Sequence, residues 1–175
     1  EYVEVGDDQL VSTIGSVSAW IKLSAIGANR TVVGKFNAGG GKREWLLQVD
    51  SAGKVIFTAQ QDKSVFAENT KATSTTTLSA NTWYHVLGTF SPTNNVKIYI
   101  NGEPEHTSAA AATNGCEVTD TPIYIGWVAS GGGYFSGQIS NVAVWDAELT
   151  AADITSIYNG GKGADLQNAD TYDTD

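Results

Sequence analysis

The chain has 175 residues, of which ten are Lys or Arg and nineteen are Asp or Glu, so its formal net charge is −9. Because phosphate binding requires a positive field, this balance argues against nucleic acid and anionic membrane surfaces as partners. A single cysteine, Cys116, excludes an internal disulfide and the usual cysteine-based zinc sites. No apolar run approaches the roughly 18 residues of a membrane span.

Apolar and polar residues alternate over several short segments, which is the pattern of a β-sandwich. Asp50-Ser-Ala-Gly53 predicts a hairpin turn, and Asn101-Gly102 is typical of a type I′ turn, because both of its residues tolerate positive φ. Segment 70–79, nearly all Thr, Ser and Ala, predicts an exposed edge strand. The other predicted strands cover residues 2–5, 17–23, 31–36, 44–50, 55–60, 83–90, 96–101, 122–127 and 138–145.

The long connections at 37–43, 62–81, 107–120 and 129–133 contain mainly small, polar or glycine residues. Loops of this kind at the rim of a rigid sandwich commonly carry binding sites. We therefore look for functional residues at their ends.

The hydrophobic period changes once, after the last predicted strand. Thr150 is a good N-cap, and Asp153, three residues on, completes an acidic capping box. The residues Asn159-Gly160-Gly161 tolerate positive φ and predict the end of the helix. The sequence thus predicts one helix of about two turns, with one apolar face formed by Leu149, Ile154, Ile157 and Tyr158.

Four segments in order carry a family resemblance: WYHVLGTF (83–90), VKIYINGE (96–103), IYIG (123–126) and FSGQISNVAVWD (135–146). They resemble the laminin-G-like and pentraxin-like branch of the concanavalin A-like lectin/glucanase superfamily. The resemblance implies an all-β jelly-roll sandwich of two antiparallel sheets with one short C-terminal helix. The closing segment 157–161 and the high content of Ser, Thr and Ala are also similar to those of domains in phage and marine-virus structural proteins.

We expect the sandwich domain to occupy residues 1–161 and an acidic tail or linker to occupy residues 162–175. The first residues are already strand-like, which indicates one domain of a longer protein.

Catalytic motifs of the superfamily are missing from the sequence. Its glucanases use a Glu-x-Asp-x-Glu string, in which one carboxylate attacks the sugar and the other protonates the leaving group, and no such string occurs. The family uses the histidine that corresponds to His85 structurally, and His106 has no nucleophile in its sequence context. We predict that the chain is not an enzyme; an unfamiliar glycosidase is the weaker alternative.

Calcium is the cofactor that the resemblance implies. A pentraxin-type site needs carboxylates after the IYIG strand, and this chain has Trp127-Val-Ala-Ser130 there. A laminin-G-type rim site remains as an alternative, with Asp62 and Asp120 as the candidate loop ligands. Solvated loop carboxylates are the competing interpretation.

The strongest functional indication is aromatic. Sugar sites commonly stack a ring on an aromatic side chain beside a few directed polar groups. Trp127 and Tyr134 flank one glycine-rich loop, and Arg43 and Trp45 end another, so these four residues are the predicted ligand-binding site. In the competing interpretation Trp127 and Trp45 pack inward, as expected for Trp20, Trp83 and Trp145.

We predict a non-catalytic recognition module that binds glycans or glycosylated surfaces within a larger extracellular or virion protein. The alternative is a structural or assembly domain, in a phage or a fibre, that contacts only neighbouring protein subunits.

Overall fold

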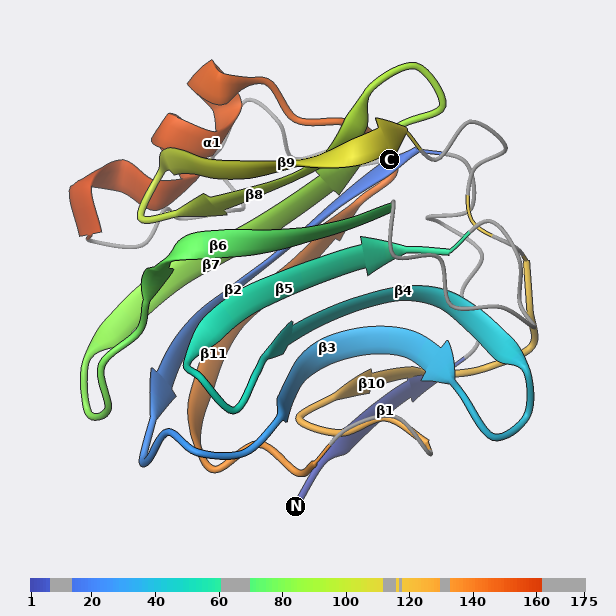
Figure 1. Ribbon diagram of the computed structural model, residues 1–175, viewed down its shortest axis with the longest axis horizontal. Coiled ribbons are helices and arrows are strands. Elements are labelled where there is room, and N and C mark those ends of the chain that lie inside the picture. Colours follow the sequence, from blue (N-terminus) through green and yellow to red (C-terminus); the bar gives the residue numbers. More distant parts are fainter. Residues whose placement is uncertain (7–13, 61–69, 112–115, 117, 130–132, 162–175) are drawn as a thin grey trace.

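The computed structural model describes residues 1–6, 14–60, 70–111, 116, 118–129 and 133–161. Within them, eleven strands form two antiparallel sheets (Figure 1). The six-stranded sheet has the order β1-β10-β3-β4-β5-β6 and the five-stranded sheet the order β11-β2-β7-β8-β9. The strands are β1 (Val3–Gly6), β2 (Gly15–Leu23), β3 (Arg30–Asn37), β4 (Lys42–Val49), β5 (Lys54–Ala59), β6 (Lys71–Thr77), β7 (Trp83–Phe90), β8 (Asn95–Ile100), β9 (Glu103–Ala111), β10 (Ile123–Ile125) and β11 (Gly137–Trp145).

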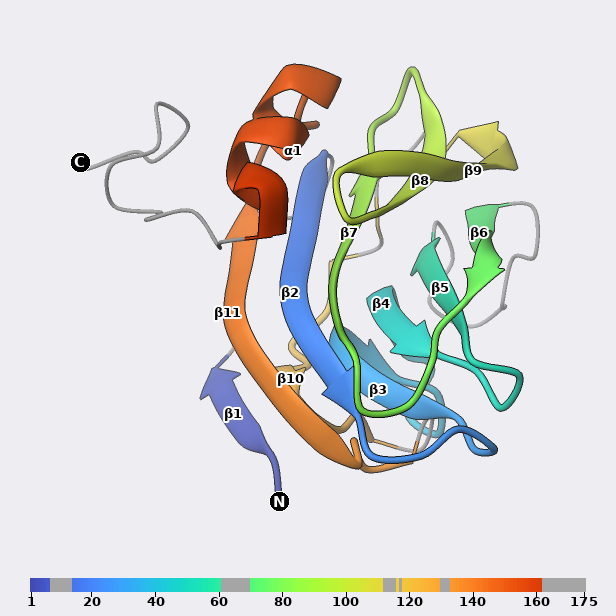
Figure 2. The same ribbon diagram turned by 90° about the vertical axis from the view of Figure 1, so that its left-hand side faces the viewer.

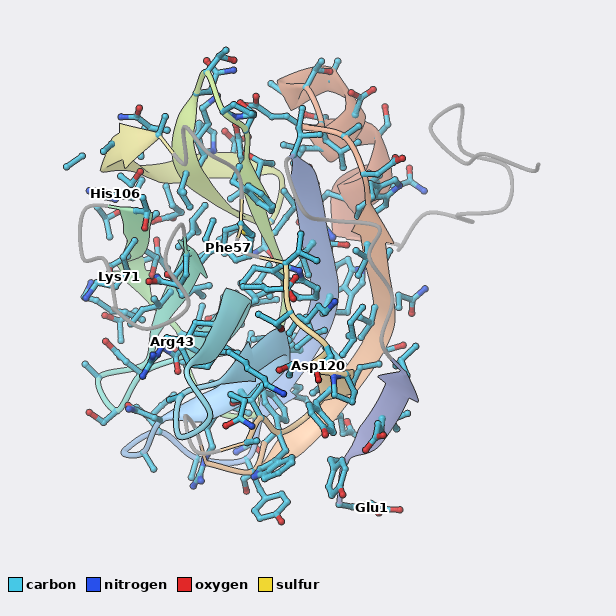
Figure 3. All side chains as sticks on the ribbon, turned by 90° about the vertical axis from the view of Figure 1, so that its right-hand side faces the viewer. Glu1, Arg43, Phe57, Lys71, His106 and Asp120 are labelled. Carbon is cyan, nitrogen blue, oxygen red and sulfur yellow. The ribbon has the colours of Figure 1, made fainter. Side chains whose placement is uncertain are left out.

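The main core lies between the two sheets, because every second side chain of a strand points to the same face. Leu47 and Phe57 enter it from the six-stranded sheet, and Ile21 and Val86 enter it from the five-stranded sheet. Figure 3 shows Phe57 near the centre of the molecule. This all-β sandwich confirms the predicted fold class.

Each predicted strand is present, most with ends shifted by a few residues, and segment 70–79 contains the edge strand β6. Strand β9 was not among the predicted strands; residues 107–120 were predicted to be a long connection, and this was wrong for residues 107–111, which belong to β9. β9 is an edge strand with a mostly exposed surface, so its sequence lacks apolar alternation. The predicted strand 122–127 ends early, because Gly126 adopts a φ of 82°.

Both predicted turns are confirmed. Asn101 and Gly102 have φ values of 52° and 81° between β8 and β9. Asp50 closes the other hairpin, since its carboxylate accepts hydrogen bonds from the backbone N–H groups of Ala52 and Lys54, at 2.8 and 2.9 Å.

A carboxylate joins the two sheets along one open side of the sandwich. Glu105 on β9 accepts hydrogen bonds from the backbone N–H and hydroxyl groups of both Thr75 and Thr76 on β6, at 2.6–3.0 Å. Edge strands expose unpaired backbone groups, and these contacts satisfy two of them. Partial burial acts to raise the pKa of Glu105, but the threonine hydrogen bonds outweigh it and hold that pKa below its ordinary value.

Helix α1 (Ala151–Tyr158) covers the outer face of the five-stranded sheet (Figure 2). Thr150 and Asp153 form the predicted capping box, and Asn159 ends the helix with a φ of 49°. Ile154 and Ile157 pack against Leu87 and Tyr99 of the sheet. The described part of the chain contains no helix of the length and apolarity needed to cross a membrane. The expected tail, 162–175, lies outside the described residues.

Gly88 on β7 provides a test of the sheet packing, because a Cβ atom there would overlap the ring of Phe57. We expect Gly88→Ala to lower the free energy of unfolding by about 3 kcal/mol through overpacking of the core. Urea unfolding measures the change in the free energy of unfolding. Gly40→Ala is the control, because the atoms nearest to a Cβ there belong to the side chain of Asn37. Equal stability of the two variants would contradict the described packing.

The carboxylate of Glu105 should stabilise the fold most above its unfolded-state pKa, since its folded-state pKa is lowered, and this contribution should disappear as the pH falls through the folded-state value. We expect Glu105→Gln to cost about 1 kcal/mol at pH 7 and less at pH 3. Urea unfolding at both pH values tests this. Glu103→Gln, an exposed change on the same strand, should have little effect at either pH.

Candidate functional site

Four aromatic side chains gather on the outer side of the six-stranded sheet, near its β1 edge. We call Tyr2, Tyr124, Trp127 and Tyr134 the aromatic cluster. The ring centroid of Trp127 lies 5.0 Å from Tyr2, 5.2 Å from Tyr124 and 5.9 Å from Tyr134. The Trp127 and Tyr134 rings are nearly parallel, at 18°, whereas Tyr124 meets Trp127 edge-on at 77°.

The backbone after β10 explains why Trp127 lies on this outer side. Gly126, with positive φ, turns the chain at the end of β10, and Ala129 then forms a parallel bridge with Asn37 at the end of β3. Val128 is buried there against Phe36 and Leu46. A Cβ at Gly34 would lie 2.7 Å from Leu46 and 3.2 Å from Val128, so glycine makes room for this packing.

The other two exposed rings reach the cluster from distant parts of the sequence. Tyr2 precedes β1, whose Glu4 pairs with Tyr124 on β10. Tyr134 is held between two backbone hydrogen bonds, from Thr31 N–H to the Gly133 carbonyl and from Phe135 N–H to the Gly126 carbonyl, at 3.2 and 2.8 Å. The sheet register and these bonds position the cluster.

The cluster is partly open to solvent. Tyr2 is 44% exposed and Tyr134 51% exposed, while Trp127 and Tyr124 are half-buried. The pKa of the Tyr124 hydroxyl is raised by burial and by the nearby charge of Glu4, to which it is hydrogen-bonded. On the other side, Arg30 donates from Nη1 to the backbone carbonyl of Tyr134 at 3.3 Å. The cluster can therefore present aromatic faces beside a few polar groups.

Of the four residues predicted to share a site, the structure brings Trp127 and Tyr134 together. Trp45 is fully buried in the core between the sheets, so the prediction that its ring faces a ligand was wrong. Its strand position explains this, because Trp45 pairs with Lys35 and lies one residue before Leu46, which points to the outer face. Arg43 donates to the Ala38 carbonyl at 2.9 Å and lies over the Phe36 ring. Figure 3 shows Arg43 well away from Glu1, the residue that precedes Tyr2 of the cluster, so Arg43 does not join the cluster.

The expected inward packing of three other tryptophans also needs correction. Trp83 is 40% exposed, with the Lys22 ammonium 5.4 Å from its ring centroid. Trp20 and Trp145 are half-buried on the outer face of the five-stranded sheet, where Trp20 stacks on Tyr158 and Trp145 packs near Leu149. Helix α1, and not the core, covers Trp20 and Trp145.

Two members of the cluster, Tyr2 and Tyr124, were missed from the sequence. In Ile123-Tyr124-Ile125 the tyrosine alternates with two core-facing isoleucines, and this signal places it on the outer face. Tyr2 carries a weaker signal, because its place depends on the pairing of β1 with β10, some 120 residues along the chain.

Neither candidate metal ligand, Asp120 or Asp62, is placed at the aromatic cluster. Asp120 forms an ion pair with Lys42, at 2.5 Å, and Lys42 holds the pKa of this exposed carboxyl below its ordinary value. Asp62 lies outside the described residues. Among the residues that the structure describes, no three His, Cys, Asp or Glu side chains group as a metal site would require. Calcium stays a prediction.

The buried charges of the described chain face each other inside the sandwich. Lys35 Nζ lies 3.2 Å from the carboxylate of Glu44, which also accepts two 2.7 Å hydrogen bonds from Thr119. Burial raises the pKa of Glu44, and these partners oppose it. The pair anchors Thr119 and the neighbouring segment to the sheets, which is a structural use of a carboxylate.

His85 lies beneath helix α1, away from the aromatic cluster. Its ring packs beside those of Trp20 and Tyr158, with centroids 5.5 and 6.1 Å away. Burial lowers the pKa of His85 to about 4. A neutral, enclosed imidazole of this kind fits the structural role that was predicted for it.

Comparison with known proteins supports the fold. A family model described as the concanavalin A-like lectin/glucanases superfamily (Laminin_G_3) matches residues 1–155. A comparison with curated protein sequences gave no match.

Solved structures are similar at low identity. A proposed carbohydrate-binding protein from Bacteroides ovatus shares 23% identity over 95% of this chain and 46% of its own, with a TM-score of 0.69. The heptameric SAP-like pentraxin of Limulus polyphemus shares 19% over 85% and 70%, with a TM-score of 0.61. A Trypanosoma rangeli sialidase shares 16% over 83% and 22%, with a TM-score of 0.60. At these identities the likeness establishes the fold, and this chain spans less than half of two of these proteins.

The environment of His85 predicts a pH effect on stability. Its folded-state pKa, about 4, lies below its ordinary value of 6.5, so the folded state binds fewer protons than the unfolded state between these values. Stability should therefore fall by about 3 kcal/mol as the pH drops from 6.5 to 4. Urea unfolding across this range measures the change. His85→Phe should remove this component, and His106→Gln, an exposed change on β9, should keep it.

Proposed function

This chain belongs to the concanavalin A-like lectin/glucanases superfamily, and we propose that it is a non-catalytic recognition module that binds glycans or glycosylated surfaces. The fold hosts many activities, so the proposal depends on the site. The observation that carries it is the aromatic cluster, in which Tyr2, Trp127 and Tyr134 lie together at the surface.

Aromatic surfaces suit sugars for a physical reason. One face of a pyranose ring is lined by C–H groups, and it stacks on an aromatic ring while its hydroxyls meet polar groups at the edge. The cluster offers three rings in mutual contact, with the tyrosine hydroxyls and the Glu4 carboxylate at their edges. The likeness to the Bacteroides ovatus protein, whose name refers to carbohydrate binding, points in the same direction.

The interactions of two carboxylates, Glu44 and Glu4, favour binding without catalysis. Glycoside hydrolysis requires two carboxyl groups placed on either side of the scissile bond. The buried Glu44 is paired with Lys35, and Glu4 lies opposite Tyr124 on the β1–β10 ladder, where, together with burial, its charge raises the pKa of that tyrosine. The chain spans only 22% of the similar sialidase, so that enzyme's activity does not transfer to it.

We place the module within a larger protein of the cell exterior or a virion surface, where glycans are available. Membership of a lectin-like family supports the cell exterior. The virion surface is supported only by the similarity in composition and closing segment to virus structural proteins.

One observation favours the alternative of an assembly domain. Val3 and Val5 on the edge strand β1 are each 56% exposed, and such residues can pack against a neighbouring subunit. Under this alternative the protein would associate with other subunits and would bind no glycan.

A glycan array with the purified protein separates the two functions. We expect Tyr134→Ala and Trp127→Ala each to weaken binding at least tenfold, because loss of a stacked aromatic ring costs about 1.5 kcal/mol or more. Trp83→Ala is the matched control, since it removes another exposed aromatic ring from the opposite sheet.

The array is run in calcium and again in EDTA. Loss of binding in EDTA would establish a metal requirement, and Asp120→Asn would then test that candidate ligand. Equal loss in Trp83→Ala and Tyr134→Ala would contradict the placement of the site. Absence of binding by a folded protein would contradict glycan recognition and favour assembly.

A further inference from the structure

We propose that the aromatic cluster selects uncharged glycans over anionic ones, an inference that rests on the proposed function of this site. Four features carry it: the packing of the rings, the carboxylates on one side of them, the engagement of the arginine on the other side, and the charge of the whole chain.

The rings form a packed surface and not an open cage. Their centroids lie 5.0–6.3 Å apart, so the aromatic side chains contact one another directly. A cage for a quaternary ammonium group needs space for the cation between the rings, since each ring faces it. A ligand must therefore lie on the outer surface of the cluster, where the flat apolar face of a sugar ring fits.

Carboxylates border the rings along β1. Glu4 pairs with Tyr124 across the β1–β10 ladder, is hydrogen-bonded to the Tyr124 hydroxyl, and contributes to the raised pKa of that tyrosine. Glu4 is exposed, as is Glu1, which immediately precedes Tyr2. The Glu1 carbonyl oxygen lies 3.5 Å from the position that a Cβ on Gly126 would take, next to Trp127. An anionic sugar on the rings would therefore lie close to the carboxylate of Glu4, which pairs with Tyr124.

Arg30 is a cation in direct contact with the cluster, and its guanidinium is directed toward backbone. Its Nη1 donates to the Tyr134 carbonyl, and the same atom lies 3.4 Å from the Cβ position of Gly133. Arg30, a half-buried residue, thus holds its guanidinium against the chain that carries Tyr134. Two further cations are placed elsewhere, with Lys22 over Trp83 and Lys42 paired with Asp120.

The net charge of −9 acts in the same direction, because it lowers the local concentration of anions. One carboxylate about 6 Å from a bound anion in a watery surface weakens binding about threefold. Salt screens this effect, with a Debye length of about 8 Å at physiological ionic strength. The preference for uncharged glycans should therefore decrease as salt is added.

The experiment compares pairs of glycans whose members differ by one anionic group, lactose with 3′-sialyllactose and N-acetyllactosamine with its 6-sulfated form, on the same array and by calorimetry. At low salt we expect the neutral member of a pair to bind at least threefold more tightly. Glu4→Gln should narrow this ratio, which compares the two members of a pair on the same variant and so does not depend on a change in binding that both members share. Glu103→Gln, which removes an exposed carboxylate on β9, should leave the ratio as it is. Thermal unfolding of each variant confirms that it is folded.

The outcomes separate the two proposals. Tighter binding of the anionic members, lost in Arg30→Gln, would overturn the selectivity and leave glycan recognition standing. If the neutral glycans bind more tightly and Glu4→Gln does not change the ratio, the selectivity does not come from the carboxylate on β1, and that part of the proposal is overturned. If neither pair binds and the wider array is also negative, the proposed function fails, and the selectivity fails with it.

Discussion

The contact between Phe57 and Gly88 sets the spacing of the two sheets. The ring occupies the space that a side chain at position 88 would take, so the sheets approach closely at the centre of the sandwich. Once the sheets are fixed there, their outer faces and their edges must be completed separately. Each uses a different device: helix α1 on one face, the turn at Gly126 on the other, and Glu105 along one edge.

The aromatic cluster depends on this order of construction. Val128 packs on the outer face of β3 and β4, where a Cβ at Gly34 would crowd it at 3.2 Å, and that packing fixes Trp127 one residue earlier. The cluster then receives Tyr124 from β10 and Tyr2 from the residue before β1, which among the described strands pairs with β10 alone. Its position at a sheet edge follows from strand order, and its solvent exposure follows from that position.

The sequence predicted what depends on local chemistry. The capping box at Thr150, the Asn101-Gly102 turn and the main strands are encoded by neighbouring residues, and the structure contains them. The sequence did not predict β9, because the mostly polar residues of this strand show no apolar alternation. The contact that holds Glu105 of β9 was also out of reach, since its partner Thr76 lies 29 residues away in the chain. Trp45 shows the same limit: its loop suggested exposure, but a bulge between Lys35 and Phe36 sets which side chains of β3 and β4 turn inward. The Trp127 and Tyr134 pair was found from sequence because both residues flank one short loop, whereas Tyr2 was not found because only sheet pairing brings it there.

The edge position of the cluster also relates the two candidate functions to each other. Val3 and Val5 alternate with Tyr2 and Glu4 on one short segment, so the same segment offers apolar side chains on one side and the ring surface on the other. A partner that covered the valines would approach the β1 edge from the side of the sandwich interior, while a glycan would approach from the outer face. The two surfaces share a backbone and little else, so glycan binding does not require the valines to be free. Recognition and assembly can therefore coexist on β1, and the carboxylate of Glu4 lies on the glycan side of that strand.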